Sequence, residues 1–265
     1  MVKRNSLSAI ATSSSGVATL MGTAFGIALL AAFSVAPPMQ AENPDHVRQL
    51  VETNQCRGCD LRNADLAEID LTAAELTNAD LRGADLRGTI LAGSTLVDAK
   101  FRGANLQGAD LNRADLLGVD FTNANLSETN LSQSYLGGAN LSRANLSAAI
   151  LSNAQLEGVN MREVELRGAE LSNAQLTGAY LPDADLSDAN LENAKLNGSE
   201  LAAADLRDAD LSGAQLNSAN LTDANLRGAD LSEAVLTNAD LTGANLTDTN
   251  LSQSQLNGLA GRPNL

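Results

Sequence analysis

A large apolar residue occupies every fifth position of the chain from Leu61 to Leu256. These forty positions hold thirty-seven leucines, together with Phe101, Phe121 and Met161. A period of five matches neither an α-helix, with about 3.6 residues per turn, nor a β-strand, with a period of about 2. Short unbroken periods are typical of solenoids, in which each unit buries its apolar face only by stacking on the next unit. The period therefore predicts a solenoid.

We call each of these positions a centre, and the residue two before it is small. It is Ala in twenty-eight of the forty units, and the other units have Ser, Thr, Cys, Val or, once, Ile69. A column of large side chains leaves room only for methyl-sized neighbours, so we expect these two positions to point inward and the other three outward. Gly and Asn are common after the centre and suit a sharp corner, because both tolerate unusual backbone angles.

The repeating unit, Ala-(Asp/Asn)-Leu-(Ser/Thr/Arg)-(Gly/Asn), resembles the pentapeptide-repeat family. Ala104–Gly108 and Ala224–Gly228 are examples, and the match covers about residues 54 to 258. The resemblance implies an all-β fold, a right-handed quadrilateral β-solenoid with four pentapeptides in each coil. Forty units would then make about ten coils and a rod roughly 48 Å long at the usual strand spacing.

The first part of the chain, residues 1–41, has a different composition. Lys3 and Arg4 precede an uncharged stretch that is mostly apolar from Val17 to Val35. This pattern predicts a secretory signal peptide that is cleaved after Ala41, which would leave an exported protein with no membrane association. An uncleaved membrane anchor is the alternative, because nineteen residues can just span a bilayer. Family members with an export signal and a Cys-containing start are typically cyanobacterial, so the resemblance implies the periplasm or the thylakoid lumen.

Residues 42–55 are predicted to form a short N-terminal capping helix, running from Pro44 to about Thr53. Asn43 is a suitable N-cap and Pro44 suits the first turn. One face of this helix is apolar and is expected to cover the first coil; it carries Val47, Leu50 and Val51.

The solenoid is expected over residues 56–258, followed by a C-terminal tail at 259–265. This tail is too short for a good helix. An open solenoid end exposes apolar surface and unpaired strand edges. We therefore expect a partner, or a second copy of the chain in a homodimer, to cover the C-terminal end.

The two cysteines, Cys56 and Cys59, are both in phase with inward positions. They are predicted to be buried thiols or, in an oxidising compartment, a structural disulfide. A redox Cys-x-x-Cys pair is the alternative, although no thioredoxin-like strand–helix pattern surrounds it. Haem attachment would need His where Asp60 stands, and a zinc site lacks ligands because His46 is the only His.

Catalysis has little support in the composition. The chain has one His and no Trp, and its many carboxylates lie in a regular outward row. Few groups are therefore suited to acid–base or nucleophilic work. No Gly-rich phosphate loop is present, since the glycines recur at the expected corners. We predict no catalytic residue, no metal site and no cofactor, and a protein that is not an enzyme.

If residue n stacks on residue n+20, the residues before the centres form four ladders, one on each face. On the face that we call acidic, all ten are Asp, Asn or Glu: Asp65, Asp85, Asn105, Asn125, Asn145, Glu165, Asp185, Asp205, Asn225 and Asn245. On the face that we call low-charge, they are Glu75, Thr95, Asp115, Tyr135, Gln155, Gln175, Lys195, Gln215, Val235 and Gln255.

The acidic face carries fourteen charges when the two residues after each centre are included, and the low-charge face carries five. The low-charge face also holds Val97 and Leu117. Docking surfaces are depleted in charge and enriched in Tyr, so this face is a candidate interaction surface, with random drift on a tolerant surface as the alternative. The candidate residues are Tyr135, Gln155, Gln175, Lys195, Gln215 and Val235.

The chain carries a net charge of −15, which becomes −17 if Lys3 and Arg4 leave with the signal peptide. Such an acidic rod repels nucleic acid and anionic membranes. We expect an exported structural or protein-interaction rod with an unknown protein partner. One alternative is a DNA-mimicking inhibitor of a type II topoisomerase, an activity of some pentapeptide-repeat proteins, although an export signal conflicts with a cytosolic target. The other is a redox protein that uses Cys56 and Cys59.

Overall fold

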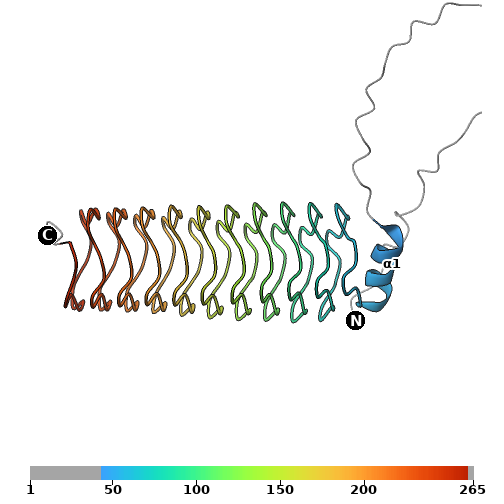
Figure 1. Ribbon diagram of the computed structural model, residues 1–265, viewed down its shortest axis with the longest axis horizontal. Coiled ribbons are helices and arrows are strands. Elements are labelled where there is room, and N and C mark those ends of the chain that lie inside the picture. The colour runs from blue at the N-terminus through green and yellow to red at the C-terminus, as the bar shows by residue number, and fades with distance from the viewer. Residues whose placement is uncertain (1–42, 262–265) are drawn as a thin grey trace, which may run out of the picture. The chain divides into compact units, whose positions relative to one another are not determined.

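The computed structural model describes residues 43–261. The predicted signal peptide and its cleavage after Ala41 lie outside the described residues. The described chain begins with the helix α1 (Pro44–Thr53) and continues as a stack of similar coils (Figure 1). Within residues 43–261, no helix is both long enough and apolar enough to cross a membrane.

Successive coils are joined by parallel β-bridges between residue n and residue n+20. These bridges run from Gln55↔Glu75 to Asp240↔Ala260, so each coil contains four pentapeptides. Each bridge is supported by main-chain hydrogen bonds, such as that from Leu61 N to Asp80 O at 2.8 Å. The predicted solenoid is therefore present, and every backbone segment is held mainly by the coil before it and the coil after it.

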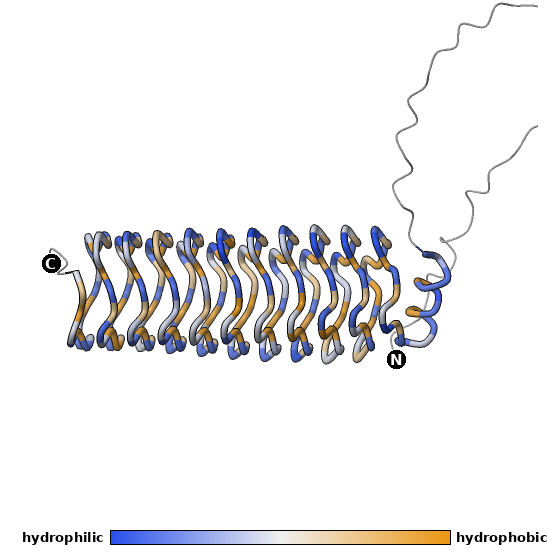
Figure 2. The backbone as a smooth tube through the Cα atoms, in the orientation of Figure 1, coloured by the Kyte–Doolittle hydropathy of each residue, from blue (hydrophilic) through white to orange (hydrophobic). Residues whose placement is uncertain are grey.

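The core is a continuous apolar column inside the coils. All centres from Leu61 to Leu241 are at most 2% exposed, and the small residues two positions before them are almost all buried as well. Apolar and polar residues accordingly alternate along each coil (Figure 2). Ile69, the one Ile at a small position, is only partly buried. The prediction of two inward and three outward positions is confirmed.

Some of the small inward residues carry hydroxyl groups, and these groups are satisfied by the backbone. Ser134 Oγ donates to Leu131 O at 2.6 Å, and Thr89 Oγ1 donates to Leu66 O at 2.7 Å. No buried side-chain nitrogen or oxygen within residues 43–261 lacks a hydrogen-bond partner. Ser and Thr therefore replace Ala here without the cost of an unsatisfied polar group.

The corners of the coil lie at the two residues after each centre. The second of these residues has a positive φ, between 55° and 74°, throughout the stack. From Cys56 to Leu251, each turn closes with a hydrogen bond to the carbonyl of the centre, as from Ala64 N to Leu61 O at 3.1 Å. A positive φ at the third turn position is the mark of a type II turn and favours Gly and Asn. Glu68 and Arg113 adopt the same conformation, so the stacked coils maintain the corner even where the residue is neither Gly nor Asn.

The helix α1 forms where the sequence predicts it. The Asn43 side chain accepts hydrogen bonds from the backbone amides of Asp45 and His46, at 3.2 and 3.4 Å. Val47 and Leu50 are buried in the same apolar cluster as the centres. The helix therefore lies against the first coil and continues its core (Figure 1).

The last described coils differ from those before them. Their centres are only partly buried, together with one further leucine near the end: Leu246, Leu251, Leu256 and Leu259. These apolar side chains lack a following coil within the described residues.

Candidate functional site

The structure brings the predicted interaction residues into one column. Parallel bridges link Tyr135 to Gln155, Gln155 to Gln175, and so on through Lys195, Gln215 and Val235. These residues come from positions twenty apart in the sequence and lie on successive coils of one face. Their side chains point outward, since the residues on either side of each one are buried.

The low-charge face carries two of the most exposed apolar side chains of the described chain. Leu117 is 52% exposed and Tyr135 is 49% exposed. Leu117 lies against Gly137 of the next coil, where a Cβ atom would be 3.3 Å from Leu117 Cδ1. The glycine thus leaves room for the leucine side chain, and the two exposed apolar groups belong to adjacent coils.

One kind of hydrogen bond is much less frequent on this face than on the other three. Elsewhere the Asp or Asn before a centre usually accepts a bond from the backbone amide two residues later. The bond from Ser127 N to Asn125 Oδ1, at 3.1 Å, is typical. That amide has no backbone acceptor of its own, which explains why Asp and Asn are preferred at this position. The sequence alone predicts only that these residues lie on the surface.

We call this side-chain hydrogen bond to the backbone amide a cap. On the low-charge face, the cap is missing from Tyr135 onward. Gln175 Nε2 donates to Asn173 O at 2.9 Å instead of capping the following turn. Within the described residues, the backbone amides of Gly137, Glu157 and Thr177 have no protein acceptor. The face therefore presents outward N–H groups that water or a bound partner must satisfy. The absence of Asp and Asn from this ladder after Asp115 was the sequence signal for them.

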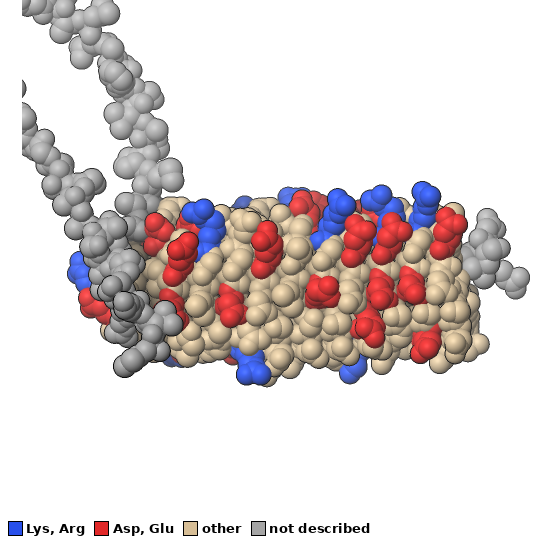
Figure 3. All heavy atoms as spheres, turned by 180° about the vertical axis from the view of Figure 1, so that it is seen from behind, with Lys and Arg blue, Asp and Glu red and all other residues tan. Residues whose placement is uncertain are grey.

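The two faces also differ in how their charges are arranged. On the acidic face, Arg87 binds Asp85 and Arg207 binds Asp205, each at 2.6 Å. The hydrogen bond from Arg207 lowers the pKa of Asp205. Basic side chains likewise lie beside acidic ones on the side of the rod shown in Figure 3. The acidic face is therefore partly neutralised by its own arginines.

The charged residues in the central part of the low-charge face remain outside such pairs. Glu157 and Lys195 are exposed, and neither forms an ion pair within residues 43–261. They are the only charged residues of this face between Tyr135 and Gly258. Each is therefore available to a partner without a competing internal ion pair.

The two cysteines lie next to α1. Cys56 and Cys59 are joined by a disulfide and are 0% and 4% exposed. Cys56 Sγ is 3.4 Å from the carbonyl of His46, and the amide of Asp60 donates to His46 Nδ1 at 3.0 Å. The disulfide thus lies beneath the helix, at the junction with the first coil.

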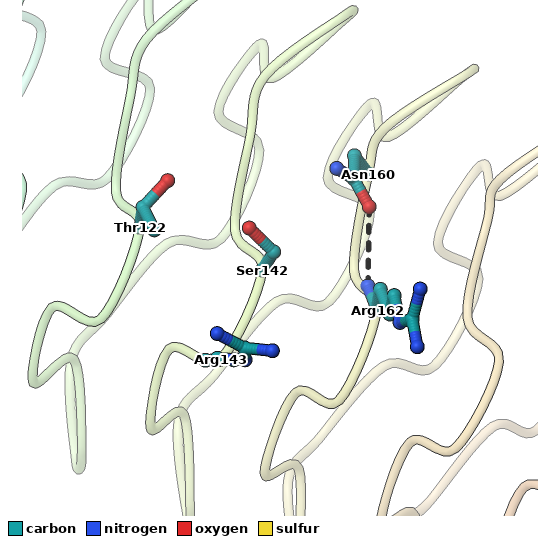
Figure 4. A pocket seen from close by; sticks show the side chains of 5 residues that line it. All are labelled: Thr122, Ser142, Arg143, Asn160 and Arg162. Atoms are coloured by element: carbon teal, nitrogen blue, oxygen red, sulfur yellow. Dashed lines mark hydrogen bonds between the residues drawn. The ribbon is translucent and has the colours of Figure 1, made fainter.

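A shallow hollow on another face contains two arginines (Figure 4). Arg143 and Arg162 both bind Glu163, at 2.7 and 3.1 Å, and the hydrogen bond from Arg143 lowers the pKa of this carboxylate. The remaining lining residues are Thr122, Ser142 and Asn160. These groups contain no nucleophile–base pair. Across residues 43–261, no group of His, Cys, Asp and Glu is placed to hold a metal ion.

The chain is similar to several solved structures, among them pentapeptide repeat proteins from a cyanobacterium and from a plant. HetL from the cyanobacterium Nostoc sp. strain PCC 7120, involved in heterocyst differentiation regulation, is 33% identical over 83% of this chain and 96% of its own, with a TM-score of 0.45. A trypsin-treated form of QnrB1, a plasmid-mediated fluoroquinolone resistance protein, is 23% identical over 63% and 89%, with a TM-score of 0.44. A protein from the Arabidopsis thaliana thylakoid lumen is 27% identical over 51% and 74%, with a TM-score of 0.23.

Comparison with curated proteins found no match. The family model for pentapeptide repeats (8 copies) matches most of the coiled region, at residues 55–93, 94–133, 124–162, 139–178, 149–187, 184–223 and 219–258. Together with the coil of four pentapeptides, this match identifies the fold as the right-handed quadrilateral β-solenoid. The chain belongs to the pentapeptide-repeat family.

Proposed function

We propose that this protein is an exported, non-enzymatic rod of about ten coils that binds a protein partner on its low-charge face. The contrast between the faces carries this proposal, since one face of a strongly acidic rod has few charges and exposes Leu117 and Tyr135. Charge is depleted at the centre of protein interfaces, and Tyr is enriched there. Exposed aromatic and aliphatic side chains are also the usual anchors of such contacts.

The outward amides of Gly137, Glu157 and Thr177 support the same surface. A protein partner can supply carbonyl or carboxylate oxygens to these donors in place of water. Direct hydrogen bonds of this kind add to complementarity at an interface. The neighbouring Gln155 and Gln175 side chains can both donate and accept, so they can adapt to the partner.

Export is the second part of the proposal. It rests on the basic start at Lys3 and Arg4, the apolar stretch that follows, and a cleavage site after Ala41. The Cys56–Cys59 disulfide fits an oxidising compartment, where such bonds persist. The periplasm or the thylakoid lumen is the proposed location. Retention of the apolar stretch as a membrane anchor is the alternative.

A role in redox chemistry or DNA mimicry has less support. Both cysteines are buried, whereas a redox pair needs an accessible sulfur. DNA mimicry needs a continuous negative surface, but Arg87 and Arg207 interrupt the acidic face by binding its carboxylates. We expect no inhibition of DNA supercoiling by a type II topoisomerase.

The C-terminal end is a further candidate contact. Leu251 and Leu256 are only partly buried there, so a second copy of the chain could cover them in a homodimer. Replacement of Leu256 by Arg would disrupt that contact while leaving the low-charge face unchanged.

Affinity capture from the exported compartment tests the docking proposal. The bait is the wild-type rod, and its variant carries Tyr135→Glu with Gln175→Glu. A matched control carries Asn145→Asp with Asn225→Asp, which adds the same charge to the acidic face. We expect the wild type and the control to retain a partner that the face variant loses. Equal capture by all three baits would show that the low-charge face is not the docking surface.

A further inference from the structure

We infer that the low-charge face binds a second copy of this chain in antiparallel orientation. This inference rests on the proposed docking role of that face and names its partner. The two-fold axis would cross the rod at Gln175, within the plane of the face. Most homodimer interfaces are isologous, so the same patch must be complementary to itself after this rotation.

The central charges of the face meet this requirement. The coil of Lys195 follows the coil of Gln175, and the coil of Gln155 and Glu157 precedes it. Rotation about Gln175 therefore places Lys195 opposite the coil that carries Glu157 of the partner subunit. Symmetry gives the same pair twice. Both side chains are exposed and outside any ion pair in the described residues, so they can meet without breaking an internal bond.

A second pair of opposite charges obeys the same symmetry. Arg113 and Glu233 lie at the corner that leads into the low-charge face, each sixty residues, or three coils, from Asn173. Rotation places Arg113 opposite Glu233 of the partner subunit. Both are exposed, and neither forms an ion pair within residues 43–261; Arg113 Nε donates only to Gln133 Oε1, at 3.0 Å.

The exposed Tyr135 also finds a suitable position. The coil of Leu117 would face the coil of Val235, and Tyr135 would face Gln215. Leu117 itself lies two residues after Asp115, so it would face Thr237, while Asp115 would face Val235; Tyr135 meets an amide with which its hydroxyl can form a hydrogen bond. A parallel arrangement would instead place each coil opposite its own copy and would lose both pairs of opposite charges.

Net charge restricts where two copies can approach each other. The acidic face holds ten acidic and four basic residues, so two such faces repel. Two low-charge faces that meet each other avoid this electrostatic repulsion. The overlap would extend from the Thr95 coil to the Gln255 coil, roughly 40 Å by about 10 Å at usual strand dimensions. An area of about 800 Å² in total lies at the weak end of specific interfaces, so the dimer should depend on concentration.

The antiparallel dimer is tested by reversing the charges of Glu157 and Lys195 and measuring the mass of each variant by sedimentation equilibrium. The protein is purified in the form that its host exports, and its mass is measured from low micromolar to high micromolar concentration. We expect wild type to dimerise reversibly, and Glu157→Lys or Lys195→Glu alone to weaken the dimer at least roughly tenfold, since each places like charges opposite each other twice. Combining both substitutions should restore most of the affinity. Circular dichroism confirms that each variant stays folded.

Leu256→Arg is the matched control, because it changes an inward side chain at the C-terminal end and none of the outward residues of the low-charge face. It should not change the dimer, and X-ray scattering should show a maximum dimension close to that of one rod. A monomer at every concentration, or a dimer that is lost only in Leu256→Arg, would overturn the inference. So would a double variant that remains as weak as the single ones. The affinity-capture experiment would still test the docking role separately, since another protein could bind this face.

Discussion

Leu117 lies directly over Gly137, the residue that occupies the same place on the next coil. The contact leaves the leucine side chain 52% exposed, so it contributes little buried apolar area to the fold. A large apolar group held in this position is better suited to an intermolecular contact than to stability.

We therefore expect Leu117→Asp to change the free energy of unfolding by less than about 0.5 kcal/mol while abolishing binding at the low-charge face. Denaturant unfolding and affinity capture measure the two effects. Gly137→Ala is the companion variant and should displace the Leu117 side chain with a smaller effect on binding. A large loss of stability in Leu117→Asp would instead assign this residue to the core.

The core should be sensitive to both charge and size. Leu146 and Ala144 are fully buried, so Leu146→Asp should cost roughly 3 kcal/mol or more and Ala144→Leu about 1 to 3 kcal/mol. Ser147→Asp changes an outward position next to them and should cost less than about 0.5 kcal/mol. Thermal unfolding compares the three variants. Equal melting temperatures would contradict the assignment of inward and outward positions.

The cap before each centre should stabilise the turn that follows it. Asn125 accepts from Ser127 N at 3.1 Å and donates to Asn105 Oδ1 at 3.1 Å. Ser127 Oγ also donates to Asn125 Oδ1, at 2.8 Å, so Asn125→Ala removes three hydrogen bonds and should cost about 1 to 2 kcal/mol in unfolding free energy. Gln155→Ala is the matched control on the low-charge face, where no such bond exists, and should be nearly neutral. Similar losses in both variants would remove the capping explanation.

Acid should weaken the first coil through Asp60. Its hydrogen bonds with Arg62, at 2.7 Å, lower the pKa of Asp60 to about 2. The unfolded carboxyl titrates near 3.9, so this contribution is fully present above about pH 4 and is lost as the pH falls through about 2. Asp60→Asn should make the unfolding free energy less dependent on pH in this range. An unchanged pH profile would show that the ion pair does not contribute to stability.

The cysteines should be inert in the native protein. Because Cys56 and Cys59 are disulfide-bonded and buried beneath α1, alkylating reagents should label neither residue until the protein is reduced. After reduction, labelling should still be slow while the coil remains folded. Mass spectrometry measures the rate, with unfolded protein as the reference. Rapid labelling of the native protein would favour the redox alternative.

The inward and outward positions and the helix before the first coil follow from the sequence alone. The period of five identifies Leu146 and its equivalents as buried because a large side chain can recur at that spacing only if it faces a common interior. Asn43 and Pro44 likewise mark the helix start because their preferences are local. The twenty-residue coil came from family resemblance, since a period of five does not specify the number of sides.

The interactions of the outward residues are visible only in the stacked coils, that is, in the three-dimensional structure. It showed that the amide after each centre has no backbone acceptor, which explains the recurrence of Asp and Asn, as at Asn125. It also showed that Arg207 neutralises Asp205, whereas Glu157 and Lys195 have no ion pair within the described coils. Spacing along the chain cannot supply this information, because side-chain hydrogen bonds and ion pairs depend on distances between atoms that only the stacked coils bring together.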